Sequence, residues 1–297
     1  MRALLCFALL IPATSVAAQE QTFGESHFVG DVPVDVVAQW SGRGGRPHGH
    51  VEVRAGGAGT TIHDGTPAYA WAAGGSRGVL VALVGASSTV EVAYVPLVDG
   101  HPGGAVRSSI HRLASSDRSP IGAAVAERPD GFAVFWQEAS NSNPSAIYET
   151  YTARFDADGH AVGESQRVQA PWPIADVAWV PSRNQYYFLV YYGGADPRGT
   201  RLCGVHVDPA SLQNLEHPWW ASRPGAIDEA RLVVRGDAVS AVYRDDRRLF
   251  EIDVTGGSWG TDPAMAPRDH GPIASDEAYG LRVEGGSVAI RRSPLAH

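Results

Sequence analysis

The chain has 297 residues, 44% of them hydrophobic, and is rich in turn formers, with 34 Gly and 20 Pro. Its formal net charge of −8 at pH 7 argues against nucleic acid and anionic membranes as partners, because both attract basic surfaces. No long stretch has the apolar period of an amphipathic helix, so we expect a globular all-β protein. All 24 basic residues are Arg, which suggests a GC-rich bacterial genome.

The first 18 residues have the features of a secretory signal peptide. Arg2 is positively charged, residues 3–11 are apolar, and residues 16–18 form a small-residue cleavage site before Gln19. The apolar run is too short to span a bilayer. We therefore expect an exported chain, secreted or periplasmic, with no membrane insertion. Its one remaining cysteine, Cys203, excludes an intramolecular disulfide and is expected to be buried in a strand.

An internal repeat organises the rest of the chain. Similar segments start at Pro67, Pro120, Pro173 and Ala226, at intervals of 53 residues, and a closer copy starts at Pro272. Repeats of about this length are typical of solenoids and propellers. One small sheet cannot cover both of its faces alone, but sheets packed radially around an axis can.

The copy that starts at Pro120 shows the internal pattern most clearly. Strands are expected at residues 121–126, 132–136, 147–155 and 161–168. Asp130-Gly131 and Asp158-Gly159 stand at two of the connections, and Asp-Gly between apolar runs is a strong hairpin signal. Each unit is therefore predicted to be a four-stranded antiparallel meander. The second strands of the other copies are expected at residues 79–84, 186–192 and 238–243.

The two ends of the repeat region suggest how the ring closes. We expect two strands at residues 32–40 and 50–55, and two more at 279–283 and 287–291. If these pairs form one composite blade, residues 19–297 make a single domain. The prediction is a five-bladed β-propeller of four-stranded antiparallel blades, with six blades as the alternative.

Three acidic residues follow the starts of successive innermost strands: Asp176, Glu229 and Asp276. Converging carboxylates of this kind could bind Ca²⁺. They could also act as the acid and base of an inverting glycosidase if they stood about 6.5–9.5 Å apart. The simplest interpretation is that they solvate the central channel, so the sequence favours no catalytic residue and no cofactor.

Histidines next to aspartates give a second group of candidates. His63-Asp64 precedes the first whole blade, and Asp269-His270 precedes the last one. Together they could hold a transition metal, and His48-Gly49-His50 is a similar candidate. These are also ordinary turn sequences, so no metal site is predicted, and His63 and Asp64 are assigned to a ligand-binding face.

Tryptophans in the loops that lead into innermost strands complete that face. Trp172, Trp219 and Trp220 are placed in such loops. Indole can provide a flat platform for a sugar ring and an N–H donor for its hydroxyls, or it can pack between blades. The polar loop 141–145 is expected to add hydrogen-bonding groups near the same rim.

The segment 120–168, with Asp130-Gly131-Phe132 and Asp156-Ala157-Asp158-Gly159, resembles the blades of secreted bacterial β-propeller repeat proteins. The resemblance covers one blade well and implies a fold rather than an activity. Five-bladed glycosidases of the arabinanase and levansucrase type have acids in the first blade, where residues 68–72 of this chain have none. The Ser-x-Asp-x-Gly-x-Thr-Trp box of sialidases is also absent.

Two functions from different classes follow. The first is a non-catalytic extracellular binding module for a glycan or protein partner at the channel mouth, acting as a monomer. The second is a glycoside hydrolase that uses Asp176, Glu229 and Asp276. Fold alone does not choose between them.

Overall fold

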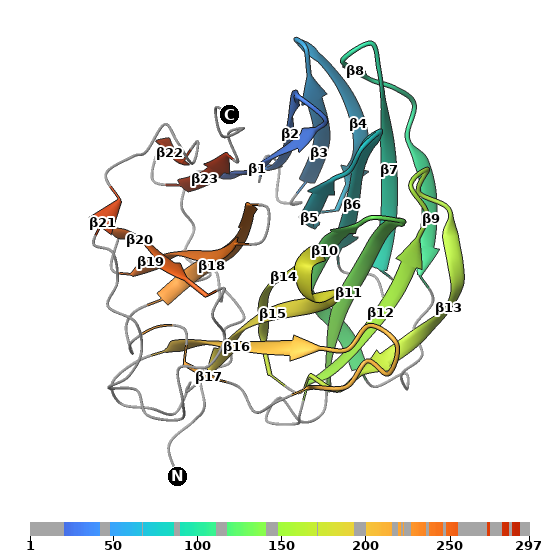
Figure 1. Cartoon of the computed structure of the whole chain (residues 1–297). Coiled ribbons are helices and arrows are strands. Elements are labelled where there is room, and N and C mark those ends of the chain that lie inside the picture. The colour runs from blue at the N-terminus through green and yellow to red at the C-terminus, as the bar shows by residue number, and fades with distance from the viewer. Residues whose placement is uncertain are drawn as a thin grey trace. The chain divides into compact units, whose positions relative to one another are not determined.

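Within the residues that the structure describes, the regular structure consists of twenty-three strands and one short 3₁₀ turn, and Figure 1 shows their arrangement. The computed structural model describes residues 21–41, 48–66, 68–85, 90–110, 118–140, 148–170, 172–192, 200–215, 219–220, 222, 227–235, 238–245, 248–254, 272–273, 281–284 and 287–291. Within these residues, no helix is long and apolar enough to cross a membrane.

The strands form five sheets, each built mainly from strands that follow one another in the chain. The first contains β1 (Gln21–Val29), β2 (Val32–Ser41), β3 (His48–Ala55) and β4 (Ala58–Gly65). The second contains β5 (Tyr69–Gly74), β6 (Gly78–Val84), β7 (Val90–Val98), β8 (His101–Pro102) and β9 (Val106–Ile110). The third contains β10 (Arg118–Arg128), β11 (Gly131–Ser140), β12 (Glu149–Phe155) and β13 (Ala161–Val168).

The fourth sheet contains β14 (Ile174–Val180), β15 (Gln185–Tyr192), β16 (Arg201–Val207) and β17 (Trp219–Trp220), with the 3₁₀ turn Pro181–Arg183 between its first two strands. The fifth contains β18 (Ile227–Arg235), β19 (Ala238–Asp245), β20 (Arg248–Asp253) and β21 (Pro272–Ile273). The last two strands, β22 (Leu281–Glu284) and β23 (Ser287–Arg291), join the first sheet.

The predicted meander is confirmed in the third, fourth and fifth sheets, which have the strand orders β10-β11-β12-β13, β14-β15-β16-β17 and β18-β19-β20-β21. The Asp-Gly turns also form as expected. Gly131 has a φ of 136°, which favours glycine, and the Asp156 carboxylate accepts the backbone N–H groups of Asp158 and His160, each at 2.9 Å. The number of blades and the closure of a ring stay predictions.

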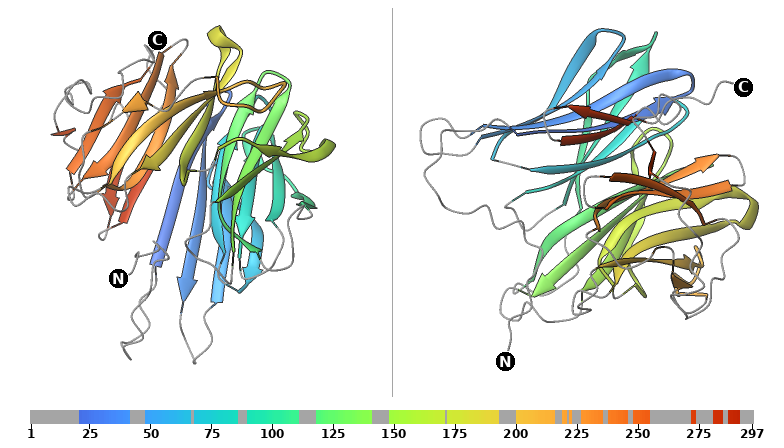
Figure 2. Two further views of the ribbon diagram at one scale, coloured as in Figure 1. Left: turned by 90° about the horizontal axis from the view of Figure 1, so that it is seen from below. Right: turned by 90° about the vertical axis from the view of Figure 1, so that its left-hand side faces the viewer.

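The N-terminal segment differs from the two strands that were expected. Strands β1 to β4 form a complete antiparallel sheet, and β23 joins β1 in parallel, with Glu25 opposite Ile290 (Figure 2). The predicted direct pairing of residues 32–55 with 279–291 is therefore wrong, because β1 lies between them. Strand β1 begins with polar residues and most of β4 is exposed, so neither shows clear apolar alternation.

A second correction concerns the copy that starts at Pro272. Residues 272–273 were expected to begin an innermost strand, but β21 is the last strand of the fifth sheet and pairs with Leu249 and Phe250 of β20. The shorter spacing of this copy is consistent with that difference. Asp276 lies outside the described residues.

The chain divides into two compact units. The N-terminal unit comprises Phe7–Trp136, Ala153–Ser165 and Ser275–His297, and the C-terminal unit comprises Met1–Cys6, Gln137–Thr152 and Gln166–Ala274. The division between the units passes through β11, β12 and β13 of the third sheet. That residues 19–297 fold as a single domain stays a prediction.

Each unit has a core between two sheets. In the N-terminal unit, buried Val, Ala, Leu and Ile side chains of β1–β4 pack against those of β5–β7. In the C-terminal unit, β14–β16 pack against β18–β20 in the same way. Strands β6 and β16 are buried at every position, so both faces of their sheets are covered. This is the burial that a stack of small sheets requires.

Candidate functional site

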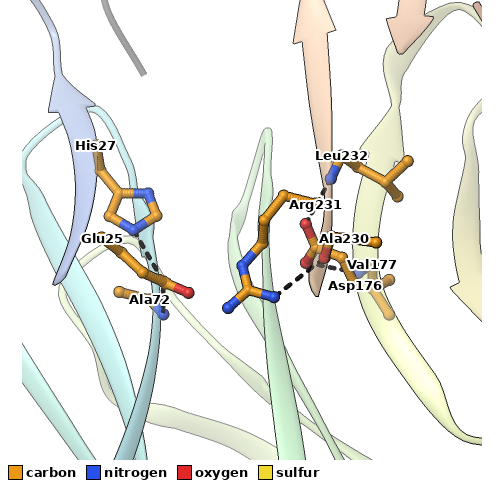
Figure 3. A network of polar contacts seen from close by, with 8 residues as sticks. All are labelled: Glu25, His27, Ala72, Asp176, Val177, Ala230, Arg231 and Leu232. Atoms are coloured by element: carbon orange, nitrogen blue, oxygen red, sulfur yellow. Dashed lines mark hydrogen bonds and ion pairs between the residues drawn. The ribbon is translucent and has the colours of Figure 1, made fainter. Parts of the chain in front are cut away.

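Asp176 is the one candidate acid whose side chain is described, and it makes structural contacts. It lies on β14 beside a register shift between Ile174 and Asp176, and it is 7% exposed. Its Oδ1 accepts the N–H of Val177 at 2.8 Å, and its Oδ2 accepts the N–H of Leu232 at 2.7 Å (Figure 3). Both carboxylate oxygens therefore hold backbone groups, and the second contact links β14 to β18.

Glu25 makes the same kind of contact within the N-terminal unit. Its Oε2 accepts the N–H of Ala72 on β5 at 3.0 Å and lies 3.3 Å from Nε2 of His27 (Figure 3). His27 is buried, at 3% exposure. In both units, a carboxylate on the first strand of one sheet accepts an N–H from the first strand of the next sheet along the chain. The two donor strands, β5 and β18, are sheet edges in the pairing order, so their outward N–H groups need such acceptors.

The other two candidate acids are described only in part. Glu229 lies on β18, where its backbone is opposite Arg244 after a register shift, but its side chain is outside the described residues, as is all of Asp276. The separation between the three carboxylates therefore remains a prediction. The loop 141–145 and the pair Asp269-His270 also lie outside the described residues.

Trp172 lies in the connection that leads into β14, as expected, and a buried glutamine fixes its backbone. Gln137 on β11 donates from Nε2 to the carbonyl of Trp172 at 2.6 Å and to Oγ1 of Thr150 at 3.0 Å. Its Oε1 accepts the N–H of Ile174 at 2.7 Å. The sequence analysis did not identify Gln137, because a single buried amide on an apolar strand gives no periodic signal.

Trp219 and Trp220 are not in a loop. They form β17, the last strand of the fourth sheet, with Trp219 opposite Gly204 and Trp220 opposite Cys203 on β16. The loop assignment is therefore wrong for this pair, and their side chains are outside the described residues. A two-residue strand is too short to show the alternation by which strands are recognised in a sequence.

His63 and Asp64 lie on β4 and have different partners. His63 Nε2 donates to the carbonyl of Thr66 at 2.6 Å, which fixes the segment that leads to β5. Asp64 is instead directed to two histidines of β3: its Oδ1 lies 2.9 Å from Nε2 of His48 and 3.5 Å from Nδ1 of His50. Hydrogen bonds from His48 and then His50 lower the pKa of Asp64. The sequence analysis named His48, His50 and Asp64 as candidates, but it did not predict that Asp64 contacts the two histidines.

An aromatic pair, with Tyr69 exposed and Trp71 half-buried, lies on β5 in the N-terminal unit. Tyr69 and Trp71 have ring centroids 6.1 Å apart at 41°, and Tyr69 is 38% exposed. Trp71 lies next to Gly122 of β10, where a Cβ would come 3.9 Å from Cζ2 of the indole, and Ile121 beside it is 48% exposed. The sequence signal for this pair is the alternation of Tyr and Trp in residues 69–71.

Comparisons with known proteins give a likeness to two solved bacterial β-propellers. No family model matches the chain, and no curated protein matches it significantly. An α-L-arabinofuranosidase from Clostridium thermocellum ATCC 27405 has 9% identity and a TM-score of 0.47, with 93% of this chain and 96% of that chain covered. TolB from Acinetobacter baumannii has 10% identity and a TM-score of 0.44, with 80% and 67% covered. Neither likeness carries an argument about activity.

The carboxylate of Asp176 and the Tyr69–Trp71 pair suit different roles. The oxygens of Asp176 hold backbone N–H groups in a buried position, which suits a structural role better than proton transfer. Within the Tyr69–Trp71 pair, the Tyr69 ring is exposed to solvent and the Trp71 ring is half-buried. An exposed aromatic ring beside a second ring is the chemistry of a binding platform.

Proposed function

We propose that this chain is an exported, non-catalytic binding module whose ligand is a glycan. The Tyr69–Trp71 pair, of which Tyr69 is exposed, carries the proposal. The faces of sugar rings are apolar and stack on aromatic rings, while the sugar hydroxyls need polar partners. His63 contributes indirectly, because its hydrogen bond to the carbonyl of Thr66 fixes the backbone that leads to Tyr69. A binding module could instead bind a protein partner, which is the alternative to a glycan ligand.

The predicted binding residues Trp172, Trp219, Trp220, His63 and Asp64 stay proposed ligand contacts, each within its own unit. Trp172 and the two β17 tryptophans lie in the C-terminal unit, and His63 and Asp64 lie in the N-terminal unit. We propose that the exported chain is secreted or periplasmic and acts as a monomer. Its acidic net charge of −8 suits neutral glycans better than anionic polymers.

A glycan array with the purified chain tests the proposal. We expect binding to a neutral glycan, and we expect Tyr69→Ala and Trp71→Ala each to weaken it by at least about tenfold, because a buried aromatic contact contributes about 1.5–3 kcal/mol. Val162→Ala is the matched control, since Val162 is an exposed apolar residue, at 45%, on the unrelated strand β13. Thermal unfolding followed by circular dichroism establishes that each variant is folded.

The alternative is a glycoside hydrolase with Asp176, Glu229 and Asp276 as its acids, with Ca²⁺ at the same carboxylates as a further possibility. It predicts release of reducing sugar by the unmodified chain and loss of that activity in Glu229→Gln. The contacts of Asp176 count against it. An array without any bound glycan, together with hydrolysis that depends on Glu229, would replace the binding proposal by this alternative.

A further inference from the structure

The aromatic pair of β5 points away from the first sheet. Ala70 and Ala72 pack against the core that β5 shares with that sheet. Successive side chains of a strand alternate between its faces, so Tyr69 and Trp71 point to the other face, toward β10. There, Cζ2 of the Trp71 indole lies 3.9 Å from the position that a Cβ of Gly122 would take. Gly122 therefore adds no side chain over this edge of the indole.

A carboxylate reaches the edge of β5 from the first sheet. Oε2 of Glu25 on β1 accepts the N–H of Ala72 at 3.0 Å (Figure 3). Ala72 directly follows Trp71, so this N–H belongs to the peptide group that joins the two residues. The Glu25 side chain is 18% exposed. The edge of β5 therefore carries an indole on one face and a partly exposed carboxylate beside it.

The carboxylate of Glu25 is held in place and can accept further hydrogen bonds. The same oxygen, Oε2, lies 3.3 Å from Nε2 of His27, which is buried at 3% exposure. A carboxylate has two oxygens with about four lone-pair positions, so these two contacts do not use its full capacity. A group that is already oriented loses little conformational entropy when a ligand binds.

We propose that Glu25 is a ligand-binding residue that accepts hydroxyl groups of the glycan and selects neutral sugars over uronic acids. The inference rests on the proposed function, because the same glycan stacks on Tyr69 and Trp71. Hydrogen bonds from hydroxyl groups to a carboxylate are charge-assisted and stronger than those between neutral groups. A uronic acid would instead bring a second negative charge to Glu25, and like charges in one site repel each other.

Titration calorimetry with two matched pairs of oligosaccharides tests this selectivity. The probes are cellohexaose with the β-1,4-linked hexamer of glucuronic acid, and β-1,4-mannohexaose with the β-1,4-linked hexamer of mannuronic acid. The members of a pair differ only in the group at C6. We expect at least one neutral hexamer to bind at least about tenfold more tightly than its acidic counterpart, as for one hydrogen bond to a charged group.

The salt dependence of the unmodified chain tests the same repulsion without a substitution. Raising the NaCl concentration from about 0.15 M to about 1 M shortens the Debye length from about 8 Å to about 3 Å. The ratio of neutral to acidic affinity should therefore fall. An equal ratio at both concentrations would show that no nearby negative charge selects the ligand.

Glu25→Gln is the deciding variant. Its amide oxygen can still accept the N–H of Ala72, but the negative charge is lost, so the ratio should fall by at least about tenfold. Glu91→Gln is the matched control, because Glu91 is exposed on β7, which β6 separates from β5 in the same sheet. It removes the same charge and should keep the ratio. Thermal unfolding followed by circular dichroism establishes that both variants are folded.

The outcomes separate this inference from the proposed function. If a neutral hexamer binds and Tyr69→Ala and Trp71→Ala weaken it, an unchanged ratio in Glu25→Gln would overturn the inference and leave the proposed function standing. Equal affinity of the unmodified chain for both members of a pair would overturn it as well. A chain that binds none of the four hexamers would also overturn it, and the glycan array would then decide the proposed function by itself.

Discussion

Two carboxylates, buried Asp176 and half-buried Glu25, complete the hydrogen bonding of sheet edges in the two units. Leu232 on β18 and Ala72 on β5 lie on first strands, and their N–H groups donate to Asp176 and Glu25. An unpaired backbone N–H in a buried position is costly, and an open sheet edge invites pairing with another chain. At the scale of single residues, Asp176, a catalytic candidate in the sequence, therefore joins neighbouring sheets, as Glu25 does.

Replacing Asp176 by Asn should lower the stability of the chain. The amide keeps one acceptor, but its NH₂ group then faces a backbone N–H, so one buried donor loses its partner. We expect a loss of about 1–3 kcal/mol in the free energy of unfolding. Asp208→Asn is the control, because Asp208 accepts N–H groups of Ala210 and Ser211 in an exposed turn. Urea unfolding measures the free energy of unfolding of both variants. Equal losses in the two variants would contradict a stabilising contact between Asp176 and Leu232.

Cys203 should be inert while the chain is folded. Burial raises its pKa to about 12, and only the thiolate reacts with disulfide reagents. At pH 8, where a free cysteine with a pKa of about 8.5 is partly ionised, the native chain should not react with Ellman's reagent. In 6 M guanidinium, about one thiol per chain that starts at Gln19 should react. Rapid reaction of the native chain would show that β16 opens or that the thiol is accessible.

At the scale of strands and turns, prediction succeeded where the turn chemistry is explicit. The Asp-Gly turns set the bounds of β11 and β13, and residues 161–168 form β13 as predicted. It failed for β4, which is mostly exposed, and for the two-residue strand β17. The turn Gly56-Gly57, with φ values of 57° and 80°, was the available sign of β4.

The sequence predicted which types of residue form the candidate site, but it did not predict which of them contact one another. Asp64 was paired in the sequence with its neighbour His63, but adjacent residues of a strand point to opposite faces. The partners of Asp64 come from β3 through the register of the hairpin, which the sequence does not specify. The roles of Asp176 and Gln137 likewise depend on contacts with residues far away in the chain.

Gly131→Ala tests the best-predicted turn. A Cβ at Gly131 would overlap the carbonyl oxygen of Phe155 and the backbone of Asp156, and its φ of 136° is unfavourable for alanine. The φ costs about 1–2 kcal/mol, and overlap with backbone adds about 1–3 kcal/mol. Gly30→Ala is the control, because its φ of 57° is strained but nothing lies within 4 Å. We expect a much lower urea midpoint for Gly131→Ala, and similar midpoints would show that the turn adjusts freely.

At the scale of the whole molecule, the first and last described strands meet in one sheet. Strand β23 pairs with β1 through Glu25–Ile290 and Ser26–Arg291, and β22 pairs with β23. The C-terminal strands therefore belong to the N-terminal unit. Contacts between residues so far apart in sequence form late and at a high entropic cost, but they hold the ends together once formed.

Removing residues 275–297 should destabilise the chain as a whole. The truncation exposes the edge of β1, so we expect the thermal midpoint to fall by at least about 2–4 °C and the protein to associate at high concentration. A chain that ends at Arg291 keeps β23 and should behave like the full chain. If residues 19–297 are one cooperative domain, calorimetry should show a single transition at the lower temperature. Two separated transitions, with the C-terminal unit unchanged, would instead show that the two units unfold independently.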